Sequence, residues 1–401
     1  MLGDMRPRAA FLGLALLLPG CDDRYHPPAR PSTPPVTTTP APAPTPTPAP
    51  VAKPAAPIDP IVGVVARGSH NCVRRRSGAI ACWGNNGDGQ LGDGARADQP
   101  RAVPVPGLSD ILEVSTGLNY SCARRRSGAV VCWGNNEDGQ LGDGSGARPG
   151  ARSATPVAVK GLVDAEELAG GDAHVCARRR GGGVVCWGIG GNGQLGAVTE
   201  RSATPLAVPG LTGVVQVVSG AEHACARRSG GDVLCWGRDT EGQLGDSERG
   251  SKPKPVPVVG LGDASLLVAG GNHTCAVRRT GAVVCWGSNQ HGQLGDGKTG
   301  VFAQHTPVVV TGLTGVVELA AGHEHSCART RDGRVSCWGA NAAGQLGDGT
   351  STERARPVAV GRLTGAVDLA LGTAHSCALL DTGNVTCWGS DNHRALGPRR
   401  L

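Results

Sequence analysis

The sequence is poor in aromatic residues and in lysine. Aromatic side chains make up 3% of its 401 residues, and lysine accounts for five of the 39 basic positions, so arginine carries almost all of the positive charge. The scarcity of aromatic side chains disfavours a surface that binds nucleic acid by base stacking. A short apolar run near the N-terminus, which ends at Cys21, is shorter than the roughly 20 residues that a membrane-spanning helix needs. The formal net charge of +6 is modest.

Glycine and cysteine, in contrast, are abundant. The chain contains 64 glycines without a Gly-X-Y period, which excludes collagen, and 15 cysteines. Because glycine costs about 1 kcal/mol relative to alanine inside a helix, this composition disfavours a helical protein and predicts many tight turns. The cysteine count is odd, so at least one cysteine is expected to have a separate role.

The N-terminus predicts export and a lipid anchor. Arg6 and Arg8 precede the apolar stretch, and residues 18–21 resemble a bacterial lipobox that ends at Cys21. We therefore expect a lipoprotein signal peptide at residues 1–20 and lipidation of Cys21; an ordinary secretory signal is the alternative. Either signal takes the chain to an oxidising compartment, where disulfides persist. The expected location is the cell envelope, periplasmic or at the cell surface.

A segment rich in proline, threonine and alanine follows, at residues 21–59. Such a composition cannot bury enough apolar surface to fold, and each proline lacks a backbone donor, so an extended tether is expected. A proline-rich recognition ligand is the alternative interpretation.

A repeat of about 50 residues fills the rest of the chain, residues 60–397. In each copy a cysteine is followed ten residues later by Cys-Trp-Gly, which accounts for all seven tryptophans and fourteen of the cysteines. The cysteine pairs are Cys72 and Cys82, Cys122 and Cys132, Cys176 and Cys186, Cys225 and Cys235, Cys275 and Cys285, Cys327 and Cys337, and Cys377 and Cys387.

Each copy predicts four short antiparallel strands. In the sixth copy, for example, two strand-like runs flank Asp332-Gly333, a dipeptide that is a strong hairpin signal. Seven such units fit the blades of a propeller better than a sandwich. The expected fold is therefore all-β, a seven-bladed β-propeller of four-stranded repeats.

A glycine-rich loop, Gly-Gln-Leu-Gly, follows the fourth predicted strand in six copies and is degenerate in the last. Together with Trp-Gly and the His-x-Cys-Ala strand, this loop resembles the regulator of chromosome condensation repeat family. The resemblance implies a seven-bladed propeller. It says little about activity, because the family includes nucleotide-exchange factors, secreted enzyme inhibitors and many binding modules.

The final copy lacks an outer strand. Pro-Val-type strands lie between successive copies, but the chain ends where a seventh should follow. A ring must be closed, so we expect residues 51–59 to supply that strand.

The cysteine pairs predict seven disulfides, one in each blade. The two cysteines of a pair lie on adjacent strands about equally far from the hairpin turn, within the distance that a disulfide spans. A zinc site is the alternative, but the sequence has no Cys-x-x-Cys spacing. A dinucleotide loop lacks the required helix, and the aspartates near the glycine-rich loops lack the EF-hand pattern. We therefore expect no metal and no cofactor.

Histidine precedes the first cysteine by two residues in six copies. Because this position repeats with the fold, a structural hydrogen-bonding role is favoured over a metal site or a pH sensor. No asymmetric catalytic constellation is visible, and His323-Glu324-His325 is the one local cluster of note. We therefore expect no catalytic residues and no enzyme.

Arginines cluster in the hairpin turns and predict a basic face, strongest over the first three blades. Its expected residues are Arg74, Arg75, Arg76, Arg124, Arg125, Arg126, Arg178, Arg179 and Arg180. Aspartates near the Gly-Gln-Leu-Gly loops are expected at the opposite end of each blade. Solvated surface charge is the alternative to a docking face for an anionic partner.

Taken together, these features predict a monomeric, lipid-anchored envelope propeller that acts as a non-catalytic protein-binding scaffold. Its expected partner is an unidentified protein or an anionic envelope component; nucleic acid is disfavoured. A secreted-type enzyme inhibitor, or an enzyme acting on extracellular polysaccharide or peptide, is the alternative. Guanine nucleotide exchange is disfavoured because export separates the chain from cytosolic GTPases.

Overall fold

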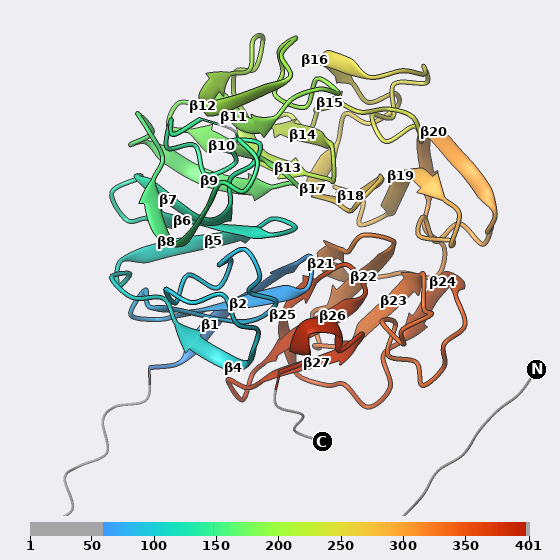
Figure 1. Ribbon diagram of the computed structural model, residues 1–401. Helices are drawn as coiled ribbons and strands as arrows, with labels where there is room; N and C mark the ends of the chain where they lie inside the picture. The colour runs from blue at the N-terminus through green and yellow to red at the C-terminus, as the bar shows by residue number, and fades with distance from the viewer. Residues whose placement is uncertain (1–58, 147, 398–401) are drawn as a thin grey trace, which may run out of the picture. The chain divides into compact units, whose positions relative to one another are not determined.

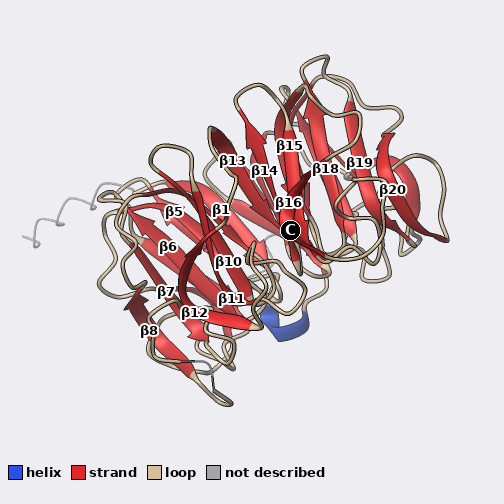
Figure 2. Cartoon of the chain, turned by 90° about the horizontal axis from the view of Figure 1, so that it is seen from above, coloured by secondary structure: helices blue, strands red, loops and turns tan. Residues whose placement is uncertain are grey.

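The protein is a seven-bladed all-β propeller. The computed structural model describes residues 59–146 and 148–397, and the seven sheets in this part of the chain surround a central axis (Figure 1). Six of these sheets have four antiparallel strands, and the seventh has three. The view in Figure 2 shows strands throughout and a single short helical turn. The fold predicted from the repeat is thus confirmed.

Within each blade the strands run in chain order from the channel to the rim. The first strands, which line the channel, are β1 (Ile61–Arg67), β5 (Ile111–Thr116), β9 (Ala165–Gly170), β13 (Val214–Ser219), β17 (Ala264–Ala269), β21 (Val316–Ala321) and β25 (Ala366–Leu371). The second strands are β2 (His70–Arg75), β6 (Tyr120–Arg125), β10 (His174–Arg179), β14 (His223–Arg228), β18 (His273–Arg278), β22 (His325–Thr330) and β26 (His375–Leu380).

The third strands carry the Cys-Trp-Gly sequences. They are β3 (Ile80–Gly84), β7 (Val130–Asn135), β11 (Val184–Ile189), β15 (Val233–Gly237), β19 (Val283–Asn289), β23 (Val335–Gly339) and β27 (Val385–Gly389). The outer strands are β4 (Gln99–Pro104), β8 (Arg152–Ala158), β12 (Arg201–Ala207), β16 (Lys252–Pro257), β20 (Val301–Val309) and β24 (Arg354–Ala359). A short 3-10 helix, η1 (Asn392–Arg394), follows β27.

Disulfides join the second and third strands of every blade. The register places Cys122 directly opposite Cys132, and the other six pairs are aligned in the same way. The Cα atoms of each pair are 4.0–4.1 Å apart. All seven disulfides expected from the ten-residue spacing are present, and each one fixes the register of its hairpin.

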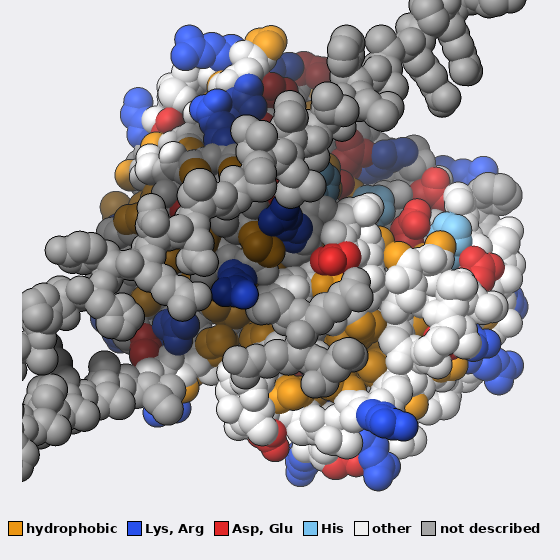
Figure 3. Space-filling view, turned by 60° about the horizontal axis from the view of Figure 1, so that its bottom comes forward, with side chains coloured by type: hydrophobic (Ala, Val, Ile, Leu, Met, Phe, Trp, Pro, Cys, Tyr) orange, Lys and Arg blue, Asp and Glu red, His pale blue; other side chains and the backbone are white. Residues whose placement is uncertain are grey.

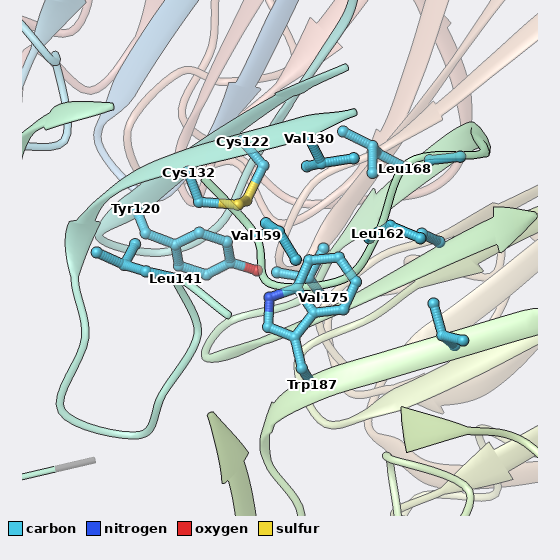
Figure 4. Close-up of a cluster of buried hydrophobic side chains, with 13 residues drawn as sticks. Tyr120, Cys122, Val130, Cys132, Leu141, Val159, Leu162, Leu168, Val175 and Trp187 are labelled. Carbon is cyan, nitrogen blue, oxygen red and sulfur yellow. A yellow bond between two sulfur atoms is a disulfide. The ribbon is translucent and has the colours of Figure 1, made fainter. Parts of the chain in front are cut away.

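The hydrophobic core lies between neighbouring blades. Figure 4 shows one such cluster, in which Trp187 of the third blade packs near Leu141 and the Cys122–Cys132 disulfide of the second. The indole Nε1 of Trp187 donates a hydrogen bond to the carbonyl oxygen of Gln140, 3.0 Å away. The Gly-Gln-Leu-Gly loop is therefore a structural support: its leucine fills the core, and its glutamine carbonyl holds the tryptophan of the next blade.

The second glycine of this loop cannot be replaced by a larger residue. Gly142 has φ +67°, and a Cβ atom there would lie 2.7 Å from Nε1 of Trp187. A side chain at this position would both strain the backbone and displace the indole ring. The repeated glycine thus keeps neighbouring blades in close contact.

The first and last blades close the ring through direct contacts. Asp368 Oδ2 accepts a hydrogen bond from the backbone N–H of Val64 at 2.9 Å. Trp83 Nε1 of the first blade donates a hydrogen bond to the carbonyl oxygen of Ala395 at 3.0 Å. Ala395 in the last loop is therefore the equivalent of Gln140, whose carbonyl accepts from Trp187.

The outer edge of the last blade differs from that of the other six. Among the described residues no strand pairs with the outer edge of β27, and a groove of about 520 Å³ runs beside it. Trp388, which lines this groove, is partly exposed, whereas Trp187 is fully buried. The outer strand expected from residues 51–59 lies outside the described residues except for Asp59, whose carboxylate accepts a hydrogen bond from the Ser77 hydroxyl at 2.6 Å.

Candidate binding surfaces at the two ends of the channel

The strand register defines two faces of the propeller. In the first blade Arg74 lies opposite Ile80 next to the hairpin turn, and His70 lies opposite Gly84 at the other end. We call the end with the arginine-rich turns between second and third strands the turn face. The loop face is the end with the loops between first and second strands and the Gly-Gln-Leu-Gly loops. The arginine clusters and the glycine-rich loops therefore lie at opposite ends of each blade.

The first arginine of a turn cluster pairs with a carboxylate on the first strand. The register places Glu113 opposite Arg124, and Arg124 Nε lies 2.9 Å from Glu113 Oε2. The same pairing joins Arg178 Nε to Glu167 Oε2 at 3.3 Å. In the first blade, Gly63 takes this position opposite Arg74, so no carboxylate is available there.

These carboxylates also link successive blades. Glu113 accepts a hydrogen bond from the backbone N–H of Leu168 at 3.1 Å, and Glu167 accepts one from that of Val217 at 2.9 Å. Burial raises the pKa of Glu167 to about 7 and also raises the pKa of Asp368, which accepts from Val64. In the second and third blades, the first arginine of the cluster thus supports a buried carboxylate that belongs to the blade-to-blade contact.

In the second and third blades, the second arginine pairs with an aspartate in the loop before the first strand. Arg125 Nη1 lies 2.6 Å from Asp110 Oδ1, and Arg179 Nε lies 2.8 Å from Asp164 Oδ1. Exposed pairs of this kind contribute little to stability, about 0.2–1 kcal/mol. These aspartates do, however, offset the positive charge of Arg125 and Arg179 on the turn face.

The third arginine of each cluster is exposed and makes no salt bridge within the described part of the chain. These residues are Arg76, Arg126 and Arg180. The positive surface is therefore smaller than the nine arginines suggest, because the first two arginines of the second and third clusters pair with carboxylates. On the side of the molecule shown in Figure 3, basic and acidic side chains are interspersed.

Five of the six repeated histidines hydrogen-bond to the adjacent blade near the loop face, whereas neither ring nitrogen of His174 has a partner among the described residues. His70 Nε2 lies 2.9 Å from Ser121 Oγ of the next blade, and His273 Nε2 lies 2.8 Å from Ser326 Oγ. Burial lowers the pKa of both histidines to about 3, so they are neutral at ordinary pH. The structural role expected for these histidines is confirmed at these positions. In the described part of the chain no group of three His, Cys, Asp or Glu residues is arranged to hold a metal.

One position at the channel mouth breaks the seven-fold repeat. Five residues before the first cysteine, six copies have glycine and the first copy has Arg67. At the six glycines a Cβ atom would lie 1.8–2.3 Å from the ring of the following tyrosine or histidine. In the first blade the glycine is shifted by one residue, to Gly68 with φ +57°.

The Arg67 side chain crosses the loop-face mouth to other blades. Its Nη2 lies 3.1 Å from Asp172 Oδ1, and its Nη1 donates to the carbonyl oxygen of Ser219 at 3.2 Å. His323 Nε2 lies 3.8 Å from Asp172 Oδ2. First, third, fourth and sixth blades thus meet at one polar cluster.

Asp172 and His323 each stabilise the charged form of the other. Burial alone would raise the pKa of Asp172, but contact with His323 and the charge of Arg67 outweigh it and hold that pKa well below its usual range. In turn, the contact with Asp172 raises the pKa of His323. The remaining space around the cluster is about 10 Å³, which is too small for a substrate.

Sequence reasoning missed this cluster, although a signal was present. When the seven copies are aligned on their first cysteine, Arg67 stands alone among glycines. At the next position, Asp172 and His323 carry the only ionisable side chains among the seven copies. Such departures from a repeat identify the residues that the fold alone does not require.

A sequence profile of the RCC1-like domain matches residues 33–314. The chain belongs to this family. Profiles of the regulator of chromosome condensation (RCC1) repeat also match residues 316–345 and 366–394, and residues 332–379. The resemblance read from the repeats is therefore confirmed. No curated protein sequence matches the chain.

Solved structures share the RCC1-like fold. A chain in the crystal structure of Kap60 bound to yeast RCC1 (Prp20) superposes with a TM-score of 0.72 at 22% identity, covering 88% of this chain and 87% of that one. Human WBSCR16 gives 0.72 at 23% identity, with coverage of 83% and 87%. Prp20p from Saccharomyces cerevisiae gives 0.70 at 23% identity, with coverage of 86% and 85%. These similarities establish the architecture and no more.

Proposed function

We propose that this RCC1-like propeller is a lipid-anchored scaffold of the cell envelope, which binds an anionic partner, most simply a protein, without catalysing a reaction. The observation that carries the proposal is the row of exposed arginines on three successive blades. Arg76, Arg126 and Arg180 make no salt bridge in the described part of the chain, whereas Arg124, Arg125, Arg178 and Arg179 each pair with a carboxylate. Unpaired positive charge at equivalent positions of adjacent blades suits a partner with an extended negative surface.

Two further observations support the location and the class of partner. Seven disulfides fit an oxidising environment outside the cytosol. No helix among the described residues is long and apolar enough to cross a membrane. The proposed anchor is Cys21, after a signal peptide at residues 1–20; both lie outside the described residues. Yeast RCC1 (Prp20) was solved bound to Kap60, and the Prp20p structure was described together with its binding to Gsp1p and histones. These related propellers support a protein as the class of partner.

The proposed function is tested by reversing the three exposed arginines, with the variant R76E/R126E/R180E. A matched control, R96E/R148E/R249E, makes the same charge change at exposed arginines in the loops between third and fourth strands. Each protein is cross-linked in intact envelopes and recovered by an affinity tag. We expect one stoichiometric partner with the parent and the control, and its loss with the turn-face variant.

The same experiment separates the alternatives. Equal capture by all three proteins would place the partner elsewhere and reject the arginine face. Degradation of purified envelope polysaccharide or peptide by the parent, with no captured partner, would contradict the scaffold and favour an enzyme. Binding to anionic lipid vesicles alone would identify the membrane surface, rather than a protein, as the target.

A further inference from the structure

We propose that Arg67, Asp172 and His323 form a latch across the loop-face mouth of the channel, which closes that end and holds the ring together. We call these three residues the channel latch. The latch does not depend on the function proposed above, because it lies on the opposite face from Arg76 and its equivalents.

The backbone of the first blade is built to admit the latch arginine. Elsewhere the position is glycine because the adjacent histidine or tyrosine ring occupies the space of a side chain. At Gly68, the shifted glycine, a Cβ atom would lie 2.1 Å from the carbonyl oxygen of Leu118, so the displaced glycine is required there. The first blade thus combines a special turn with a side chain that no other copy carries.

The contacts of Arg67 are directional. Its Nε and Nη2 both donate to Asp172 Oδ1, at 3.2 and 3.1 Å, and its Nη1 donates to Ser219. Charge-assisted bonds from the guanidinium plane fix the orientation as well as the distance, which lysine cannot reproduce. Arg67 and Asp172 are 16% and 22% exposed, so solvent screens their interaction less than that of a surface pair.

The latch fills the mouth of the channel. The space left among Arg67, Asp172, His323 and the surrounding glycine-rich loops is about 10 Å³. The cavity bounded by the first strands, which includes Arg67 in its wall, measures about 280 Å³. Several other residues at the loop-face ends of the first strands, such as Gly170, Ala269 and Ala321, have small side chains, so we expect removal of the guanidinium to open the wider cavity at the loop face.

The latch also connects blades that are not neighbours. The other contacts described here, such as His70 with Ser121 or Trp187 with Gln140, join each blade to the adjacent one. A ring held only by neighbour contacts can open at any single junction. Because Arg67 reaches the third and fourth blades and Asp172 meets the sixth, opening the junction between last and first blades must also break the latch.

Charged groups from several blades surround the latch and set the protonation of Asp172 and His323. Asp172 faces Arg67 from the first blade and His323 from the sixth. Besides Asp172, His323 is influenced by the negative charge of Glu324 and the positive charge of Arg67. The Asp172 carboxylate therefore interacts with the permanent positive charge of Arg67 and with the titratable imidazole of His323.

The test compares R67G with the parent protein, because glycine is the residue that six copies carry at this position. The readout is hydrogen–deuterium exchange of the channel-lining strands β9 and β13, together with the melting temperature. We expect backbone amides near the loop-face ends of these strands to exchange at least ~5-fold faster, equivalent to the loss of about 1 kcal/mol of protection, and the melting temperature to fall.

A matched control is R238A, which removes an ion pair between Arg238 and Glu222 on the same face but within one blade. Its exchange in β9 should equal that of the parent. If R67G does not fold, D172N supplies the test, because it removes the charge and keeps the size of the side chain. Parent-like exchange in β9 and β13 for R67G, or for D172N in its place, would overturn the latch.

Discussion

Arg67 Nη2 lies 3.1 Å from Asp172 Oδ1, although 105 residues separate them and they belong to blades that are not adjacent. In a fold built from repeated neighbour contacts, this pair is a direct link across the ring. Its strength depends on pH through Asp172 and through His323, which contacts the same carboxylate.

The latch is expected to be strongest in mildly acidic solution. Asp172 has a lowered folded-state pKa, so its contribution is present above its ordinary value of 3.8 and is lost as the pH falls. His323 has a raised folded-state pKa, so its contribution is full below 6.5 and is lost as the pH rises through the raised value. The difference in melting temperature between the parent and H323Q should therefore peak between pH 3.8 and 6.5. A difference that instead grows above pH 8 would contradict this coupling.

The buried tryptophans should contribute unequally to stability. Trp187 is fully buried and Trp388 is partly exposed beside the groove. Because both donate to a glutamine carbonyl, W187A and W388A remove the same bond and differ in buried area. We expect W187A to lower the unfolding free energy by about 3–5 kcal/mol and W388A by clearly less. Equal losses in denaturant titrations would show that the edge of β27 is covered in solution.

Loss of a single disulfide should lower the unfolding free energy and leave the native fold unchanged. Replacing Cys176 and Cys186 with serine opens one hairpin loop while the inter-blade core remains. The entropic model predicts a loss of about 2–3 kcal/mol, which thermal or chemical unfolding would measure. Circular dichroism of the native state should remain unchanged; loss of the β signal in this variant alone would assign the disulfides a larger role.

The anchor prediction is tested by C21S. Parent protein expressed with its own N-terminus should sediment with membranes and carry a lipid mass on Cys21, whereas C21S should be recovered in the soluble exported fraction. Because Cys21 is the one cysteine outside the repeats, the substitution leaves all seven disulfides intact. Soluble recovery of the parent would instead support an ordinary secretory signal.

The repeat made most of the fold predictable. Each Cys-Trp-Gly sequence and each Gly-Gln-Leu-Gly loop recurs because the same inter-blade contact recurs, as Trp187 and Gln140 illustrate. The disulfides followed from the ten-residue spacing because a short hairpin leaves one symmetric arrangement for two cysteines.

The surface charge is less predictable from the sequence, because the partner of a charged side chain is set by the folded register. Arg124 counted as part of a basic face, but Glu113, eleven residues earlier on another strand, lies opposite it only in the folded register. The role of Arg67 is hard to predict for a related reason: its partners belong to other copies of the repeat, and the sequence around Arg67 does not indicate them.

The bond from Trp83 to Ala395 has a consequence for how the protein is made. Every later tryptophan docks on a loop that has already been synthesised, as Trp187 docks on Gln140, so these blades can assemble in order as the chain emerges. The tryptophan of the first blade alone must wait for a loop near the C-terminus. The ring can therefore close only after Ala395 has been synthesised, and until then the indole of Trp83 lacks its acceptor.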